Sequence, residues 1–172
     1  RFKVLPPISV SLSNDVVLFS DQSTKEVVVN VQSFATNQKG EISLHLPEEW
    51  KIEPLTQSFE LVEEGERAPL KFMVSPPETA SETIATIEAK IDAQSYTKNI
   101  ISITYDHIPT QQVLVPAEAK FVRLDLRKRG EYIGYIMGAG DKVPESLEAI
   151  GYHVDLLDPS TITTSTLKRS EE

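Results

Sequence analysis

The sequence predicts a mainly β fold: an antiparallel β-sandwich of the immunoglobulin or fibronectin type, followed by a truncated β-α-β unit of the Rossmann or flavodoxin type. Up to about Pro109, short runs alternate apolar and polar residues and are separated by turn residues, which is typical of strands. From Tyr132, an apolar run, a glycine turn and a helical pattern follow one another, as at the start of a β-α-β unit. The predicted segments are a sandwich over residues 1–109, a connecting segment with one strand over 110–130, and the incomplete α/β unit over 131–172.

Composition limits the kinds of protein that this chain can be. Its 172 residues suffice for one ordinary domain and a remnant, and 40% hydrophobic with 25% charged residues fits a soluble globular protein. No apolar run is long enough for a spanning helix. The net charge of −9 disfavours binding to nucleic acid or anionic lipid. The one basic cluster is interpreted as a solvated strand end and comprises Arg123, Arg127, Lys128 and Arg129.

The absence of cysteine excludes disulfides and thiolate metal sites but does not indicate a compartment. The chain opens on Arg1 and contains no signal-peptide pattern, so we expect any targeting peptide to lie upstream or to have been removed.

Eight runs before Pro109 have the pattern of strands. In order, they contain Val10 and Leu12, residues 16–19, residues 25–34, Ile42 to Leu46, Phe59 and Leu61, Leu70 to Val74, residues 84–91, and Ile101 to Tyr105. In the third run, Val27, Val29 and Val31 share one face, which predicts that this face is buried. The run after it follows a turn at residues 37–40, so the two are predicted to pair as a hairpin.

Turn residues separate the later strands in the same way. Residues 63–66 form an acidic turn, Pro76 and Pro77 end a strand, and Glu88 and Lys90 are predicted to point outward from theirs. Roughly seven to nine strands over about 100 residues favour a sandwich, with a small barrel as the alternative.

The segment after Pro109 is predicted to leave the sandwich. Residues 111–119 are interpreted as a connection, and residues 120–126 as a strand whose apolar face is Val122, Leu124 and Leu126, with Phe121 out of phase. This strand could complete the sandwich or bridge it to the next unit, and a bridge ending at Gly130 is favoured.

The α/β unit is predicted from residues 132–137, whose nearly continuous apolar character is typical of a strand covered on both faces. A turn at residues 138–140 leads into a helix with Asp141 as N-cap, Pro144 in the first turn and Gly151 as the stop.

Residues 153–157 are the next predicted parallel strand, and residues 158–161 form a loop that enters a second helix. One crossover cannot cover both faces of a parallel sheet. We therefore expect further chain, the sandwich or a second copy in a homodimer to cover it.

Two sets of residues are candidates for ligand contact. Trp50, Tyr96 and Tyr105 could stack on sugar rings, although a lone Trp in a sandwich is more often part of the core. Gly138, Gly140 and Asp141 form a turn like that of a dinucleotide-binding fingerprint, and an acidic residue, Asp158, follows about 20 positions on. Val143 stands where the third glycine belongs, and Asp141 places a carboxylate where an anion would bind, so a structural turn is favoured.

No catalytic residue, metal ligand or cofactor is predicted. His45, His107 and His153 lie on different predicted elements, and none has a partner at metal-ligand spacing. The sequence has no G-x-S-x-G elbow, no Walker lysine loop and no Cys nucleophile. The chain is therefore predicted not to be an enzyme.

Three stretches resemble the C-terminal region of bacterial PIG-L (LmbE-like) N-acetylglucosaminyl deacetylases. They are Ile103-Thr104-Tyr105-Asp106-His107-Ile108-Pro109, then Ile133-Gly134-Tyr135-Ile136-Met137-Gly138-Ala139-Gly140-Asp141-Lys142-Val143-Pro144-Glu145, and Ile150-Gly151-Tyr152. The resemblance implies a zinc-dependent deacetylase domain upstream, then a sandwich similar to the α-galactosidase-associated NEW domain, then a domain resembling class I glutamine amidotransferases. This chain would cover the second of these and the start of the third.

The resemblance implies a periplasmic or extracellular parent that acts on N-acetylated sugars. The family's zinc-binding His-Pro-Asp-Asp run is absent from this chain, so no catalytic residue carries over. The predicted function is a non-catalytic accessory region that positions neighbouring domains. The alternatives are a carbohydrate-binding module and a small-molecule site at the turn of residues 138–141.

Overall fold

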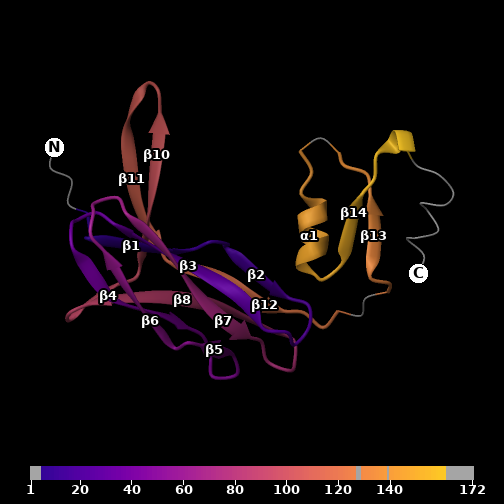
Figure 1. Ribbon diagram of the computed structural model, residues 1–172, viewed down its shortest axis with the longest axis horizontal. Coiled ribbons are helices and arrows are strands. Elements are labelled where there is room, and N and C mark those ends of the chain that lie inside the picture. Colours follow the sequence, from indigo (N-terminus) through magenta and orange to yellow (C-terminus); the bar gives the residue numbers. More distant parts are fainter. Residues whose placement is uncertain (1–4, 127–128, 139, 162–172) are drawn as a thin grey trace.

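The computed structural model describes residues 5–126, 129–138 and 140–161. Two β-sheets pack face to face, a two-stranded ribbon projects from them, and a small unit of two strands and a helix lies to one side (Figure 1). The fold is mainly β, as predicted. Among the described residues, no helix has the length and apolar character needed to cross a membrane.

The first sheet has four antiparallel strands in the order β1 (Ile8–Leu12), β3 (Lys25–Ser33), β7 (Arg67–Ser75) and β5 (Lys51–Glu53). The second has the order β2 (Val16–Phe19), β12 (Glu118–Arg123), β8 (Ser81–Ile91), β4 (Gln38–His45) and β6 (Thr56–Leu61). The short β9 (Gln94–Tyr96) also pairs with β8. In this sheet only β2 and β12 run parallel.

The hydrophobic core lies between these two sheets. Val27, Val29 and Val31 of β3 are buried, as the period-two pattern predicts, and alternate side chains of β4 and β8 face them from the second sheet. Each buried Val, Ile or Leu side chain contributes roughly 1.5–3 kcal/mol when it is fully removed from water. Glu88 and Lys90 of β8 point outward, also as predicted.

Three aromatic rings close one part of the core. The Trp50 indole lies 5.2 Å from the Phe19 ring and 5.8 Å from the Phe121 ring between centroids, both edge to face. Trp50 is only 4% exposed, so it is a core residue. The rings come from β2, β12 and the turn before β5, and they join the two sheets.

The predicted hairpin between residues 25–34 and 42–46 is wrong. β3 pairs with β1 and β7, whereas β4 pairs with β6 and β8 in the other sheet. Alternation of apolar residues shows that one face of a strand is buried. It does not indicate whether two such strands pair in one sheet or lie in opposite sheets. The connection of residues 34–37 therefore crosses between the sheets.

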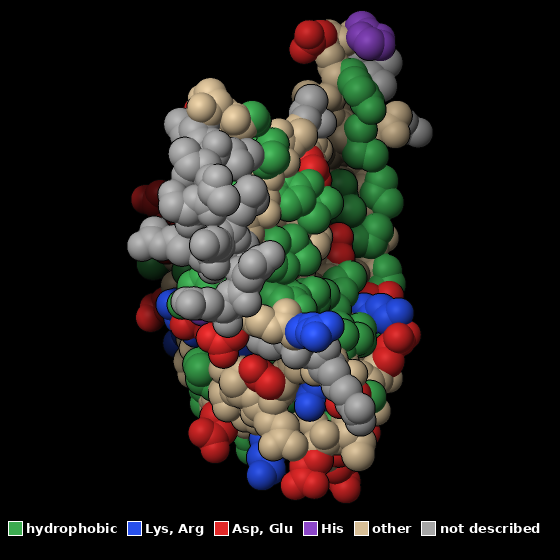
Figure 2. Space-filling view, turned by 90° about the vertical axis from the view of Figure 1, so that its right-hand side faces the viewer, with side chains coloured by type: hydrophobic (Ala, Val, Ile, Leu, Met, Phe, Trp, Pro, Cys, Tyr) green, Lys and Arg blue, Asp and Glu red, His purple; other side chains and the backbone are tan. Residues whose placement is uncertain are grey.

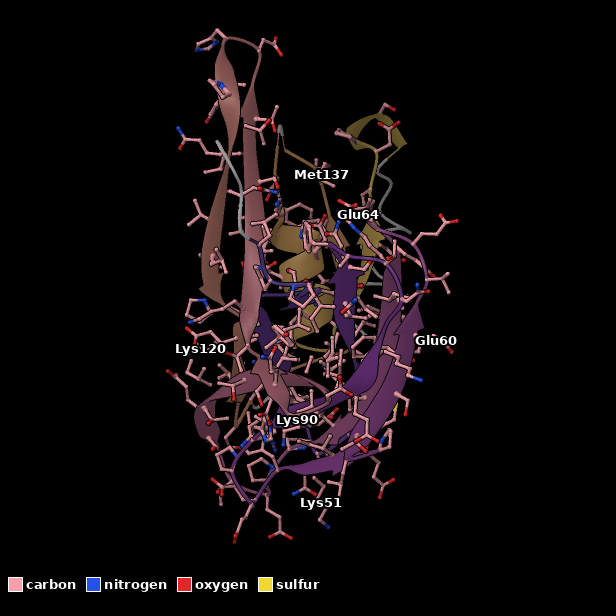
Figure 3. The ribbon with its side chains drawn as sticks, turned by 90° about the vertical axis from the view of Figure 1, so that its left-hand side faces the viewer. Lys51, Glu60, Glu64, Lys90, Lys120 and Met137 are labelled. Atoms are coloured by element: carbon pink, nitrogen blue, oxygen red, sulfur yellow. The ribbon has the colours of Figure 1, made fainter. Side chains whose placement is uncertain are left out.

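A second connection, residues 62–66, crosses back beside the first. The amide of Ser33 donates to the Glu66 carbonyl at 2.9 Å, and the amide of Asn37 donates to the Val62 carbonyl at 3.0 Å. Gly65 has a φ of +85°, which glycine adopts without a steric penalty. Glu64 marks this end of the sandwich, Lys51 marks the opposite end, and the ribbon projects toward the Glu64 end (Figure 3).

Two expectations for residues 98–126 also differ from the structure. Ile101, Ile103 and Tyr105 lie outside the sandwich, in β10 (Lys98–Tyr105), which pairs only with β11 (Ile108–Pro116) in the ribbon. Most of the predicted connection at residues 111–119 is thus a strand. Aliphatic alternation predicts a strand here correctly but does not indicate whether its apolar face meets the core.

The strand predicted at residues 120–126 is β12, and it lies inside the second sheet, between β2 and β8, rather than bridging two units. Its buried residues are Ala119, Phe121 and Arg123, so the predicted phase with Val122 inward is wrong. The prediction failed because the strand ends at Arg123, so Leu124 and Leu126 do not continue its pattern. The limits of the three predicted segments of the chain stay a prediction.

The prediction of a solvated basic cluster does not hold for Arg123. Arg123 is buried, and its guanidinium donates to the carbonyls of Leu124 and Ser20 instead of facing solvent. Arg127 and Lys128 lie outside the described residues.

The last unit consists of β13 (Tyr132–Tyr135), α1 (Val143–Ala149) and β14 (His153–Leu156), with a 3-10 turn η1 (Pro159–Thr161). The two strands pair in parallel. Gly151, at φ +92°, follows the helix as predicted. The predicted second helix lies beyond residue 161, outside the described residues, and the Rossmann or flavodoxin assignment stays a prediction.

Within the described residues, the first strand of this unit is not covered on both faces, and its cover by further chain, the sandwich or a second copy stays a prediction. Tyr132 is 52% exposed and Met137, just after the strand, is 49% exposed, because β14 is the one described strand that pairs with β13. Lys25 links the unit to the sandwich, since its ammonium donates to the carbonyls of Leu18 at 2.6 Å and Ala149 at 3.2 Å. Ala149 is in the last turn of α1, where a cation is favourable.

Candidate domain interface

The ribbon of β10 and β11 is the surface with the clearest interaction character. Its strands pair from Lys98 with Pro116 up to Tyr105 with Ile108, with an irregularity near the tip. At its base, the Ile100 amide donates to Ser9 Oγ of β1 at 3.0 Å. The outer part of the ribbon extends beyond the two sheets (Figure 1).

One face of the ribbon is aliphatic. Ile101 lies opposite Val113, and both belong to the face that also contains Ile103 and Val115. Ile101 is 45% exposed, Val113 43% and Ile103 37%. Figure 2 shows hydrophobic side chains gathered along the ribbon. Because opposite residues in an antiparallel pair share a face, these side chains form one continuous strip.

The opposite face of the ribbon is polar toward its tip. Ser102 pairs with Gln112, and the hydroxyls of Thr104 and Thr110 are 3.3 Å apart. An isolated two-stranded ribbon is marginally stable in water, and an exposed apolar strip of this kind marks an interaction site. The aliphatic face therefore has the properties of an interface with another protein surface.

The structure does not bring together the three aromatic residues predicted as sugar platforms. The buried indole of Trp50 is not available for stacking. Tyr96 is half-buried against the sandwich core, and its hydroxyl donates to Gln94 Oε1 at 2.7 Å. Tyr105 is 57% exposed near the tip of the ribbon, 6.2 Å from the His107 ring. They do not form one concave face.

The turn that contains Gly138, Gly140 and Asp141 is held by the Asp141 carboxylate. The Tyr135 hydroxyl donates to Oδ2 of Asp141, and the Val143 amide donates to Oδ1 at 2.9 Å. The hydrogen bond from Tyr135, and then the one from Val143, hold the pKa of Asp141 below its ordinary value. The same carboxylate raises the pKa of Tyr135.

The expected N-cap is off by one residue. Lys142 is the N-cap of α1, and Asp141 precedes it. Gly140 has a φ of +72°, and a side chain at Gly138 would lie 3.3 Å from the Asp141 carboxylate. These glycines therefore have conformational and steric reasons to be present without any ligand.

The three histidines lie far apart in the fold. His45 is 3.2 Å from the carboxylate of Glu88, whose pKa is lowered chiefly by the Ser95 hydroxyl. His153 stacks on Tyr132 across the β13–β14 pair, with ring centroids 5.2 Å apart. In the part of the chain that the structure describes, no three His, Cys, Asp or Glu side chains are placed to hold a metal ion.

The ribbon is an interaction surface that was not predicted from the sequence. A signal was present: two aliphatic runs, at residues 100–103 and 113–115, flank a short polar segment around Asp106. This is a hairpin pattern, but the same pattern describes a strand pair of the core.

Residues 20–94 match the family described as the NPCBM-associated, NEW3 domain of alpha-galactosidase. The matched segment runs from the residue after β2 to the first residue of β9, within the sandwich. It excludes β1, β2, the ribbon, β12 and the α/β unit. No curated protein matches the chain.

Three solved structures are similar in fold. Native alpha-2-macroglobulin from Escherichia coli, spanning domain MG7 to the C-terminus, has a TM-score of 0.42 and 14% identity over 74% of this chain and 17% of that one. A family 123 glycoside hydrolase from Clostridium perfringens has a TM-score of 0.41 and 8% identity over 77% of this chain and 30% of that one. A protein of unknown function from Porphyromonas gingivalis W83 has a TM-score of 0.39 and 11% identity over 79% of this chain and 61% of that one.

This chain therefore spans less than two thirds of each of these three structures. These likenesses are too weak to indicate an activity. Neither the family match nor the descriptions of these three structures name a PIG-L deacetylase or an amidotransferase.

Proposed function

We propose that this chain is a non-catalytic accessory region of a larger, exported, carbohydrate-active protein, and that its ribbon holds a neighbouring domain of the same parent in position. The observation that supports this role is the aliphatic face of the ribbon, with Ile101, Ile103 and Val113 more than a third exposed. The NEW3 family is described as a domain of alpha-galactosidase, which is consistent with a sandwich that accompanies an enzyme.

The chemistry of this face suits a protein neighbour better than a sugar. Between its polar ends, Asn99 and Gln111, the face consists of aliphatic side chains with no charge. Centres of permanent protein contacts are depleted of charge in the same way, whereas sugar rings stack on flat aromatic side chains. A domain of the same parent needs no high affinity, because tethering keeps its effective concentration high.

The finer proposal concerns the identity of the parent. The resemblance of residues 103–109 and 133–145 to PIG-L proteins supports a zinc-dependent N-acetylglucosaminyl deacetylase domain as the neighbour. It also supports the β13-α1-β14 unit as the start of an amidotransferase-like domain, which would supply the strands that cover β13. Pairing of this unit with a second copy is the alternative, and light scattering of residues 1–172 tests it, since a monomer at high concentration excludes it.

Hydrogen exchange tests the role of the ribbon directly. We expect the amides of residues 101–103 and 113–115 to exchange at least about tenfold more slowly in the full-length parent than in residues 1–172 alone. Equal exchange in both proteins would show that no domain covers the ribbon.

A pair of variants makes this test specific to the aliphatic face. Ile103→Lys places a charge in the proposed contact and should abolish the added protection, because an unpaired buried charge is costly. Ser102→Lys adds the same charge on the opposite face and should preserve it. Trp50 emission checks that both variants keep the sandwich folded.

A small-molecule site at Gly138, Gly140 and Asp141 has less support. The Asp141 carboxylate already accepts the hydrogen bond of the Val143 amide at the start of α1. A site of this kind also requires further strand ends to converge on the turn.

A further inference from the structure

We propose that a polar groove at the base of the ribbon binds an acidic saccharide, a sugar chain that carries a carboxylate. The groove lies on the outer face of the sheet formed by β1, β3 and β7, on the side of that sheet away from the core. It encloses about 330 Å³, near the lower end of the range typical of small-molecule sites.

Strand register brings the polar side chains of the groove into rows. Ser9 of β1 lies opposite Gln32 of β3, and Gln32 lies opposite Arg67 of β7. A second row pairs Ser11 with Asn30. Hydroxyl, amide and guanidinium groups thus follow one another across three strands. Such groups donate to and accept from the hydroxyls of a sugar.

The wall of the groove is fixed by a buried hydroxyl. Ser9 is 5% exposed, and its Oγ accepts the Ile100 amide at 3.0 Å and donates to Asn99 Oδ1 at 3.4 Å. These bonds attach the base of β10 to β1 and leave the amide nitrogen of Asn99 as a donor beside the floor. The groove is therefore held in shape before any ligand binds, which lowers the entropic cost of binding.

Charge selects an anionic ligand. Arg67 forms no ion pair with any residue in the described part of the chain, and no Asp or Glu lines the groove, although the protein has a net charge of −9. The neighbouring Glu66 is held in its own turn, where its carboxylate accepts the amides of Val62 at 2.7 Å and Glu63 at 3.0 Å. A free guanidinium binds a carboxylate with two parallel hydrogen bonds.

The composition of the lining distinguishes a sugar acid from other anions. A nucleic acid needs several basic side chains, and Arg67 is the only one among the described residues that line the groove. A simple anion would leave the side-chain amides of Gln32 and Asn99 without a role, whereas the Asn30 amide already donates to Ser13 Oγ at 2.9 Å. The larger hollow over β4 and β6 differs, because three carboxylates line it and outnumber its two lysines, which disfavours an anion.

Calorimetric titration of residues 1–172 tests the groove with three probes: an oligogalacturonate, a neutral maltooligosaccharide of the same length, and sodium acetate. We expect binding of the oligogalacturonate alone, with an affinity that falls as salt rises from 50 to 200 mM, by roughly the effect of one ion pair. Equal affinity for the neutral sugar would overturn the role of the carboxylate. Equal affinity for acetate would overturn the saccharide, and no binding of any probe would overturn the site.

The control variant removes the same charge outside the groove. Arg67→Gln should weaken oligogalacturonate binding at least about tenfold, because it removes the charge-assisted bonds. Lys71→Gln, on the same strand but ion-paired with Glu26 at 3.0 Å, should leave the dissociation constant unchanged. Equal loss in both variants would mean that only net charge matters and would overturn the site. Ile103→Lys should not affect sugar binding, so this proposal and the role of the ribbon fail independently.

Discussion

Replacing Phe121 with alanine tests whether β12 completes the core of the sandwich. The Phe121 side chain is fully buried, and its ring centroid is 5.9 Å from that of Phe19 and 5.8 Å from that of Trp50. Loss of a buried Phe costs about 3–5 kcal/mol in unfolding free energy, including the cavity that it leaves. Two aromatic contacts place this variant toward the upper end of that range.

The protein contains its own reporter for this experiment. Trp50 is the one tryptophan of the chain, and its indole is buried beside Phe121. Urea unfolding followed by its emission should show a midpoint about 1.5–2.5 M lower in Phe121→Ala, for a slope of about 2 kcal/mol per molar urea. The native emission should also shift to longer wavelength, because the cavity opens next to the indole.

Val122→Ala is the matched control, since the neighbouring residue points to the other side of the sheet and is only half-buried. We expect it to cost less than about 1 kcal/mol. The sequence prediction, with Val122 facing the core, would instead make Val122→Ala the more destabilising of the two variants. If Val122→Ala destabilises the protein more than Phe121→Ala does, β12 presents its other face to the core and our account of the core is wrong.

Three further predictions concern single contacts. Gly40→Ala should lower the unfolding free energy by about 2 kcal/mol or more, because the new methyl would lie 2.1 Å from the Lys90 carbonyl oxygen; an unchanged melting temperature would contradict this register. Tyr135→Phe should raise the pKa of Asp141 toward its ordinary value in an NMR titration, because the hydroxyl is the main cause of its lowering. In the wild type, this carboxylate stabilises the folded protein at pH values above its ordinary pKa of about 4. That stability is lost as the pH falls through its lower pKa in the folded state. Burial lowers the pKa of Lys25, so its contribution to stability should rise with pH between the folded pKa and the ordinary value of about 10.4. Urea midpoints measured at successive pH values up to about 10.4 should show this rise in the wild type and not in Lys25→Met, and an identical pH dependence in both would refute it.

The burial pattern of most strands could be predicted from sequence, but their partners could not. Val27, Val29 and Val31 are buried as expected, because a period of two identifies the face of a strand. The same period does not distinguish a neighbour in the same sheet from one across the core, which is why β3 and β4 were paired wrongly. The prediction that Ile101 and Ile103 belong to the sandwich is wrong for a related reason. Their aliphatic strip has the composition of a core face, although it is exposed.

The candidate sites depend even more on tertiary structure. Ser9, Gln32 and Arg67 are far apart in the sequence and adjacent only through the register of three strands. None of them belongs to a motif of fixed spacing, so no sequence pattern could have indicated the groove. Trp50 is the opposite case, because the common role of a lone Trp in a sandwich is the one that it has here.

The position of β12 determines the order in which the sandwich can assemble. This strand lies between β2 and β8, yet the ribbon separates it from β8 along the chain, and nearly the whole sandwich separates it from β2. Closing so long a loop around a parallel pair is slow, because chain entropy is lost before the contacts form. We therefore expect β2 and β12 amides to become protected last in pulse-labelled refolding, after β3, β7 and β4. During synthesis, β2 and β8 would then expose unpaired edges until Arg123 has left the ribosome, which makes nascent chains of this protein prone to intermolecular strand pairing.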